Sequence, residues 1–317
     1  MILGTVHILL LAGLAVIVVL ALLSPLESLR WWAGQSDEVA KAAPHASAAA
    51  AVPALENARW VVWLSGIGSV PGQTEDPFEV KFLQELRARV PNLVIVDDAF
   101  AYSVRDNPLA GKQLLDSVLR SGRTGLETGK TSMLLGTTIQ LRNTLQVAVS
   151  ADGRYGPIYN LGLAEAVVKR LVARGYVVGN SEPVTLLGYS GGGQVSVGCA
   201  RYLKQWLDAP ITVISIGGVI SSDAGLDSLD HLYHLQGGKD PMPAIGGVFF
   251  VGRWPMLKYS HWNHAVHEGR VTIIPTGPMG HMAESGYFGS PYLDHTASIV
   301  ADLIKETPDA EHAATQH

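Results

Sequence analysis

The sequence predicts an α/β fold, in which a mostly parallel sheet is covered by helices on both faces. Short apolar runs alternate with longer amphipathic stretches over residues 59–306, a pattern typical of strand–helix–strand crossovers. Hydrophobic residues make up 47% of the 317 residues, which is enough for a sizeable core. A glycine-rich turn at 188–193 also joins a predicted strand directly to a predicted helix.

Each predicted strand is a short apolar run bounded by turn residues. These runs lie at 60–64, 93–96, 184–187, 211–216, 232–235 and 271–274. The predicted helices, which show apolar spacings of three and four, lie at 78–90, 160–174, 194–207 and 292–306. Asp76 can cap the first helix, Gly175 ends the second and Pro308 follows the last, as expected at helix boundaries.

The N-terminal segment, residues 1–29, predicts a transmembrane anchor. Ile2–Leu23 is almost wholly apolar, and about 20 apolar residues suffice for a helix to cross a bilayer. A cleaved signal peptide is the alternative, but no Lys or Arg precedes the run, whereas such a peptide has a basic start. Arg30 and Lys41 follow the run and orient the chain only weakly, so the side of the membrane stays open.

The rest of the chain divides into an Ala-rich linker at 30–57, an α/β domain at 58–308 and a disordered tail at 309–317. Alanine with scattered Pro and Ser gives the linker no apolar face to bury. Two insertions, at about 99–157 and 241–269, interrupt the alternation of strands and helices. Both follow the C-terminal ends of predicted strands, where parallel sheets build their sites. We therefore expect a lid or cap from these insertions, with an extra packed subdomain as the alternative.

The turn at 188–192 has the pattern Gly-x-Ser-x-Gly, with Ser190 at its centre. A serine on a sharp turn between strand and helix has strained backbone angles, and the residues two before and two after it must be small. Such a turn lifts the hydroxyl clear of the sheet, where a base can reach it. This context predicts a nucleophile, and an ordinary glycine-rich turn is the alternative.

A serine nucleophile needs a base, and the base needs an acid to orient it. Asp240 follows the predicted strand at 232–235, and His281 follows the one at 271–274. The chain order Ser, acid, His is the one expected for this architecture, so we expect the three side chains to meet at one edge of the sheet. The competing acids are Asp223, Asp227 and Glu284, and the competing bases are His264 and His295.

Attack on a carbonyl creates an oxyanion, which needs preorganised N–H donors. The backbone N–H of Gly191, next to the nucleophile, is one expected donor. The second is expected from the loop after Leu64, with Ile67 as the leading position and Gly68 as the next.

Other classes of function have less support. The net charge of −5 and a pI near 6.1 argue against a nucleic-acid partner. The single cysteine, Cys199, excludes an internal disulfide and a multi-cysteine metal site. His261, His264 and His267 are spaced by three but lack a carboxylate cluster. Gly66–Gly72 loosely matches a dinucleotide fingerprint, but an internal proline spoils its entry into a helix. We therefore expect no metal and no cofactor.

The turn around Ser190, the Gly-Gly-Lys-Asp240 turn and the Gly-His281 loop, in this order, resemble the α/β-hydrolase superfamily over about Ala58–Pro308. The resemblance implies a serine hydrolase that cleaves an ester or related acyl bond through an acyl-enzyme, without a cofactor. Where the family usually has His-Gly in the oxyanion loop, this chain has Ser65–Gly66. The anchor and insertions favour a hydrophobic or lipid-like ester. A catalytically silent binding or scaffolding module at the membrane is the alternative, because the fold also hosts non-enzymes.

Overall fold

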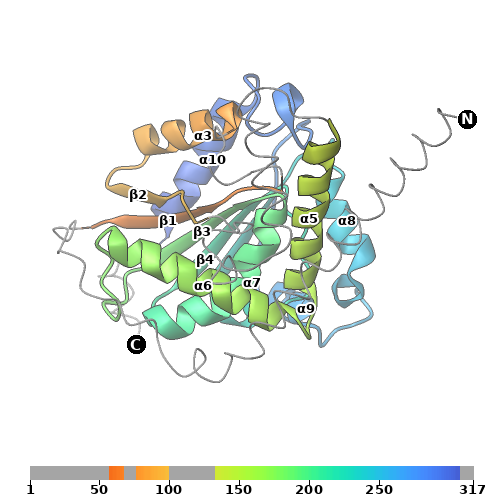
Figure 1. Ribbon diagram of the computed structural model, residues 1–317, viewed down its shortest axis with the longest axis horizontal. Helices are drawn as coiled ribbons and strands as arrows, with labels where there is room; N and C mark the ends of the chain where they lie inside the picture. Colours follow the sequence, from red (N-terminus) through yellow and green to blue (C-terminus); the bar gives the residue numbers. More distant parts are fainter. Residues whose placement is uncertain (1–56, 68–75, 100–132, 308–317) are drawn as a thin grey trace, which may run out of the picture.

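The computed structural model describes residues 57–67, 76–99 and 133–307, and a six-stranded sheet forms the centre of this part of the chain (Figure 1). Neighbouring strands all pair in parallel, in the order β2-β1-β3-β4-β5-β6. The strands are β1 (Arg59–Leu64), β2 (Leu93–Val96), β3 (Val184–Tyr189), β4 (Ile211–Ile216), β5 (His231–Gln236) and β6 (Val271–Pro275). The predicted α/β class and parallel sheet are confirmed.

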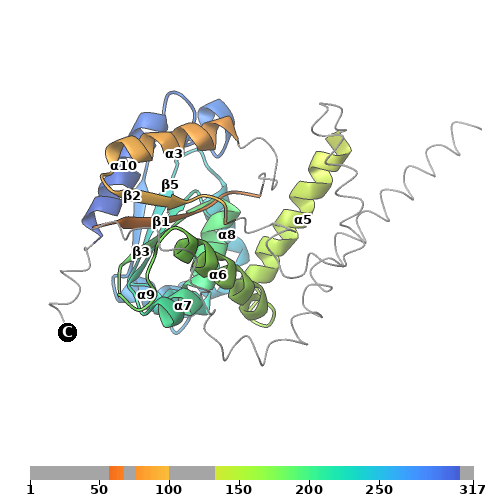
Figure 2. The same cartoon turned by 60° about the vertical axis from the view of Figure 1, so that its left-hand side comes forward.

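Helices cover both faces of this sheet. On one face α3 (Pro77–Arg89) packs against α10 (Leu293–Glu306), and on the other lie α6 (Gly156–Ala173), α7 (Gly191–Leu207) and α9 (His261–His267) (Figure 2). Two helices, α5 (Met133–Ala151) and α8 (Met242–Phe249), lie at the carboxyl edge of the sheet (Figure 1). Short 3-10 helices are η2 (Ala224–Ser228), η3 (Val251–Arg253) and η4 (Ala283–Ser285).

The strand order reverses between β1 and β3. From β1 the chain crosses through α3 to β2 at one side, whereas from β3 it proceeds strand by strand to β6 at the other. In open parallel sheets the crevice at such a reversal is where ligands bind. Residues 65–67, which leave the end of β1, and Ser190, which leaves the end of β3, therefore come together at this crevice.

Apolar side chains on the two faces of the sheet build two cores. Val62 and Leu64 of β1 join the core beneath α6 and α7, while Val61 and Trp63 join the core beneath α3 and α10. The central strands β3 and β4 are buried along nearly their whole length, as expected when both faces of a parallel sheet are covered. The loops at the carboxyl edge therefore rest on a rigid base.

Both predicted insertions contain helices at the carboxyl edge. The described part of the first insertion is α5 and the start of α6, which begins at Gly156, four residues before the predicted start at 160. Pro157 fits there because a proline in the first helical turn has no N–H bond to lose. The second insertion contains α8, η3 and α9. Whether either acts as a lid remains a prediction.

Some predicted segments lie outside the described residues. These are the anchor at 2–23, nearly all of the linker at 30–57 and the tail at 309–317. Among the residues that the structure does describe, no helix is both long enough and apolar enough to cross a membrane.

One buried histidine makes the stability of the fold depend on pH. His234 lies in β5 with no exposed surface, and burial, followed by the nearby Arg253 charge, lowers its pKa to about 3. An unfolded histidine titrates near pH 6.5. Between those two values the unfolded chain therefore binds a proton that the folded chain does not, so stability falls as the pH falls through this window.

We predict that the unfolding free energy of the full-length chain drops by about 2 kcal/mol between pH 7.5 and 5 because of His234 alone. His234→Leu should remove this part of the pH dependence, while the exposed His267→Gln should keep it. Urea unfolding at the two pH values measures the difference. Identical pH slopes for the wild type and His234→Leu would contradict the assignment.

Candidate active site

Ser190 lies on a strained turn between β3 and α7. Its φ of 54° and ψ of −121° belong to a region that a non-glycine residue adopts only when its surroundings force it to. Glycines allow the turn to form. A Cβ on Gly188 would lie 2.5 Å from the Gly192 carbonyl oxygen, and a Cβ on Gly192 would lie 2.0 Å from the Leu64 oxygen. These contacts are the steric requirement predicted from the Gly-x-Ser-x-Gly pattern.

Three side chains from distant parts of the chain form one hydrogen-bonded row. His281 Nε2 lies 2.9 Å from Ser190 Oγ, and His281 Nδ1 lies 2.9 Å from Asp240 Oδ2. Ser190 follows β3, Asp240 follows β5 and His281 follows β6, so all three lie at the carboxyl edge of the sheet. The structure therefore brings the three predicted residues together.

Both oxygens of the buried Asp240 carboxylate accept hydrogen bonds. Its side chain has no exposed surface, while that of His281 is 11% exposed. Oδ1 accepts a hydrogen bond from the Met242 amide at 2.9 Å, and Oδ2 accepts one from the Tyr287 hydroxyl at 2.7 Å. Tyr287 in turn accepts one from the Gly237 amide at 2.8 Å. These contacts replace the water that a buried carboxylate loses.

Tyr287 is a site residue that the sequence reasoning missed. It is fully buried, and burial, reinforced by its hydrogen bond to Asp240, raises its pKa well above the usual value. The hydroxyl is therefore a permanent donor to the carboxylate. A tyrosine 47 residues from its partner leaves no local pattern, so only its position shortly after the predicted His281 could have drawn attention to it.

A second tyrosine, Tyr189, holds the loop that carries His281. Its hydroxyl donates to the His281 carbonyl oxygen at 2.5 Å. Its ring also stacks on the imidazole, with 5.3 Å between centroids and 21° between planes. Because Tyr189 is the last residue of β3 and Ser190 follows it directly, the same strand end positions both Ser190 and the loop that carries His281.

The competing residues have other partners. Asp223 accepts hydrogen bonds from the Gly225 amide and from Gln194, and Asp227 lies 2.6 Å from His261 Nδ1. His264 pairs with Glu268 at 3.4 Å. The two remaining alternatives, Glu284 in η4 and His295 in α10, form no hydrogen bond with Ser190 or Asp240. The geometry favours Asp240 and His281 over all five.

The loop expected to donate to an oxyanion lies against Ser190. A Cβ on Gly66 would lie 3.3 Å from Ser190 Cβ, and Ile67 follows at once. Asn143 of α5 donates from Nδ2 to the Ile67 carbonyl oxygen at 2.7 Å, which anchors the loop to a helix. Gly191, the other expected donor, is the first residue of α7. Gly68, the alternative position, lies outside the described residues.

The residues considered for other chemistry lie apart from this row. Within the described ranges, no group of three or more His, Cys, Asp or Glu side chains is arranged to hold a metal ion. The loop from Gly66 to Gly72, considered for a dinucleotide, lies mostly outside the described residues. Cys199 is fully buried in α7, and burial raises the pKa of its thiol.

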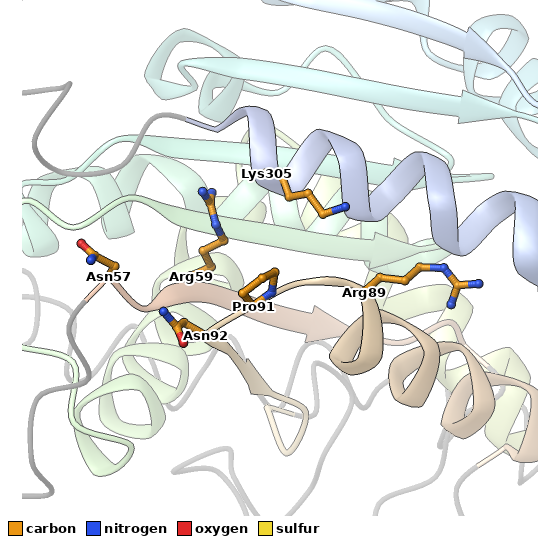
Figure 3. Close-up of a pocket in the computed structure, with 6 residues that line it drawn as sticks. All are labelled: Asn57, Arg59, Arg89, Pro91, Asn92 and Lys305. Carbon is orange, nitrogen blue, oxygen red and sulfur yellow. The ribbon is translucent and has the colours of Figure 1, made fainter.

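A cavity of about 550 Å³ lies at the opposite, amino edge of the sheet. Its lining combines the start of β1 with the ends of α3 and α10 (Figure 3). The three cationic residues in it already have partners: Arg59 donates to the Ile304 carbonyl, Arg89 pairs with Asp294 and Lys305 pairs with Asp302. This cavity has no nucleophile or base, so it is no rival to the Ser190 site.

The row at Ser190 can perform nucleophilic chemistry. An imidazole whose Nδ1 faces a buried carboxylate presents Nε2 as a proton acceptor. Nε2 lies within hydrogen-bonding distance of the hydroxyl that must lose its proton. The strained turn places that oxygen at the carboxyl edge of the sheet, directly after β3. Such an arrangement suits attack on an electrophilic carbon or phosphorus.

The comparisons with known proteins assign this chain to no family. No protein-family model matches the chain, and a search of the curated proteins finds no match to it. The candidate site therefore depends on its own geometry.

We predict that Tyr287→Phe slows the reaction of Ser190 with a fluorophosphonate reagent by on the order of tenfold, because Asp240 loses a buried donor and holds the imidazole less firmly. The matched control is Tyr202→Phe, which also loses a 2.8 Å tyrosine hydrogen bond, but to the Pro157 carbonyl away from the row. Labelling rates and thermal midpoints are measured for both. Equal labelling rates for the two variants would show that Tyr287 has only a structural role.

Proposed function

We propose that the chain is a serine hydrolase of the α/β-hydrolase type, with Ser190, His281 and Asp240 as its catalytic triad. The observation that carries the proposal is the continuous row of hydrogen bonds from the Ser190 hydroxyl through His281 to Asp240. The strained backbone at Ser190 supports it. The positions of nucleophile, acid and base after β3, β5 and β6 support the resemblance to the superfamily.

The proposed reaction is acyl transfer to water. As Ser190 Oγ attacks the acyl carbonyl, His281 Nε2 takes its proton, and Asp240 keeps the imidazole oriented through Nδ1–H. The backbone N–H groups of Gly191 and Ile67 receive the developing oxyanion. His281 then protonates the leaving group, which departs and leaves an acyl-enzyme. Water, activated by the same imidazole, releases the acid and restores the Ser190 hydroxyl.

The proposed substrate is a hydrophobic or lipid-like ester. Met282, which directly follows the proposed base, exposes 68% of its surface, so the loop that carries the base also presents an apolar side chain to the surroundings. The predicted anchor at 2–23 would hold the enzyme at a membrane, where such esters are concentrated. The mechanism needs no metal or cofactor.

We predict that a fluorophosphonate probe labels the full-length chain and that Ser190→Ala abolishes both the labelling and ester hydrolysis, because the probe reacts only with an activated hydroxyl. Ser285→Ala, which removes a hydroxyl from the loop that follows His281, should keep both. Absence of labelling in a folded wild-type protein would overturn the proposal in favour of a silent binding module.

We also predict that Asn143→Ala lowers kcat for an ester by on the order of tenfold with little change in KM, because the loop that carries the Ile67 N–H loses its anchor while ground-state binding is unaffected. Thr144→Ala is the control, since its hydroxyl bonds only within α5, to the Gln140 carbonyl, on the exposed side of the helix. A kcat equal to that of Thr144→Ala would contradict a role for this loop in transition-state binding.

A further inference from the structure

The segment that follows the proposed catalytic acid exposes a concentration of large apolar side chains. We call residues 245–259 the apolar rim. Within it Phe249 is 74% exposed, Met256 75% and Tyr259 fully exposed, and Val248 and Val251 are each more than half exposed. Single apolar residues scattered along a chain are normal on a protein surface, but several large ones exposed within fifteen consecutive residues indicate a contact with another apolar phase.

The apolar rim is a folded element, and its exposure is imposed by its hydrogen bonds. Trp254 Nε1 donates to the Val248 carbonyl, and Asn263 Nδ2 donates to the carbonyls of Trp254 and Leu257. These bonds satisfy polar groups of the segment within the domain. The backbone is thereby fixed, and the apolar side chains are left facing outward.

Arg253 fastens the middle of the rim to the domain. Its guanidinium donates to the Ile220 carbonyl at 3.1 Å and lies 3.7 Å from the centroid of the Trp262 ring. Burial lowers its pKa to about 10. Because Ile220 belongs to the loop after β4, this contact ties the rim to the loops at the carboxyl edge.

The rim is connected to the candidate active site through α8. Asp240 accepts a hydrogen bond from Met242, the first residue of α8, so the helix that leads into the rim starts two residues after the proposed acid. Met282, also exposed, follows His281. Figure 1 shows α8 at the carboxyl edge, where Ser190 lies. A surface that covers the rim would therefore lie at the same edge of the sheet as Ser190, Asp240 and His281.

Charge and composition indicate what covers the rim. Residues 241–260 contain Arg253 and Lys258 but no Asp or Glu, in a chain of net charge −5. An apolar surface with Trp254 and Tyr259 among its members and a basic residue at its border has the composition of segments that lie in a lipid interface. A lipid bilayer with some anionic headgroups meets these requirements.

The predicted tether allows this orientation. The described domain begins at residue 57, at the amino edge of the sheet and opposite the rim (Figure 1). A flexible linker of the length of residues 30–57 has a root-mean-square span of roughly 30 Å and a much longer reach when extended. A six-residue strand is only about 20 Å long. The domain can therefore turn its carboxyl edge toward the bilayer that holds the anchor.

We propose that the apolar rim lies on the lipid surface of the bilayer in which the N-terminal segment is anchored, with the carboxyl edge of the sheet facing the lipid. An ester partitioned in the bilayer then reaches Ser190 without crossing water. This last consequence rests on the proposed function, whereas the docking itself does not.

The test uses the full-length chain reconstituted in phosphatidylcholine vesicles that contain some phosphatidylglycerol. A cysteine introduced by Met256→Cys or, separately, by Tyr259→Cys is labelled with an environment-sensitive fluorophore. Cys199 does not compete, because it is fully buried and burial raises the pKa of its thiol. The control is Asp302→Cys, at an exposed position of α10 on the other side of the domain.

At both rim positions we expect blue-shifted emission and several-fold stronger quenching by nitroxide-labelled lipids than at position 302. Quenching equal to that at position 302 would overturn the proposal. So would a blue shift without lipid quenching, which would mean that a second copy or another part of the chain covers the rim. Fluorophosphonate labelling of the same samples tests the two proposals separately. If the fluorophosphonate reacts but lipid quenching is absent, only the docking proposal is wrong. If lipid quenching is present but the fluorophosphonate does not react, only the hydrolase proposal is wrong.

Discussion

The close approach between the turn at Ser190 and the end of β1 is the constraint on which the candidate site depends. Leu64 pairs with Gly188 in the sheet, and Gly192 packs so closely on the Leu64 carbonyl that a Cβ would lie 2.0 Å from it. This contact fixes the start of α7 and forces Ser190 into its strained conformation. The rigid, two-sided core beneath these strands supplies the stability that keeps the strain in place.

A single buried carboxylate organises the loops on the other side of Ser190. Asp240 has no exposed side-chain surface, so its charge is tolerable only with several donors around it. Tyr287 and the Met242 amide supply two of them, and a Cβ on Gly217 would come within 2.6 Å of Oδ2. Loops after β4, β5 and β6 thus fit around one group, which leaves the His281 imidazole a single favourable orientation.

The carboxyl edge of the sheet combines two surfaces of opposite character. Inside, Ser190 and Asp240 are buried, the His281 side chain is only 11% exposed, and each of the three has a polar partner. Outside, the segment that follows the acid turns its polar groups inward and its apolar side chains outward. One helix connects the two, because α8 begins at Met242, whose amide donates to Asp240, and leads into the apolar rim. One part of this edge is therefore a largely enclosed polar row, while the other part offers an apolar contact.

Local pattern alone determined the α/β class, the six strands and the residues of the row. Apolar runs indicate strands buried in a parallel sheet, and the glycines around Ser190 indicate a turn that only small residues permit. The partners that hold the row came only from the tertiary structure. Tyr287 meets Asp240 across 47 residues and Asn143 meets Ile67 across 76, and neither has a recurring spacing that marks it. Such contacts depend on where folding places distant segments, and this is settled by the packing of the whole sheet with its helices.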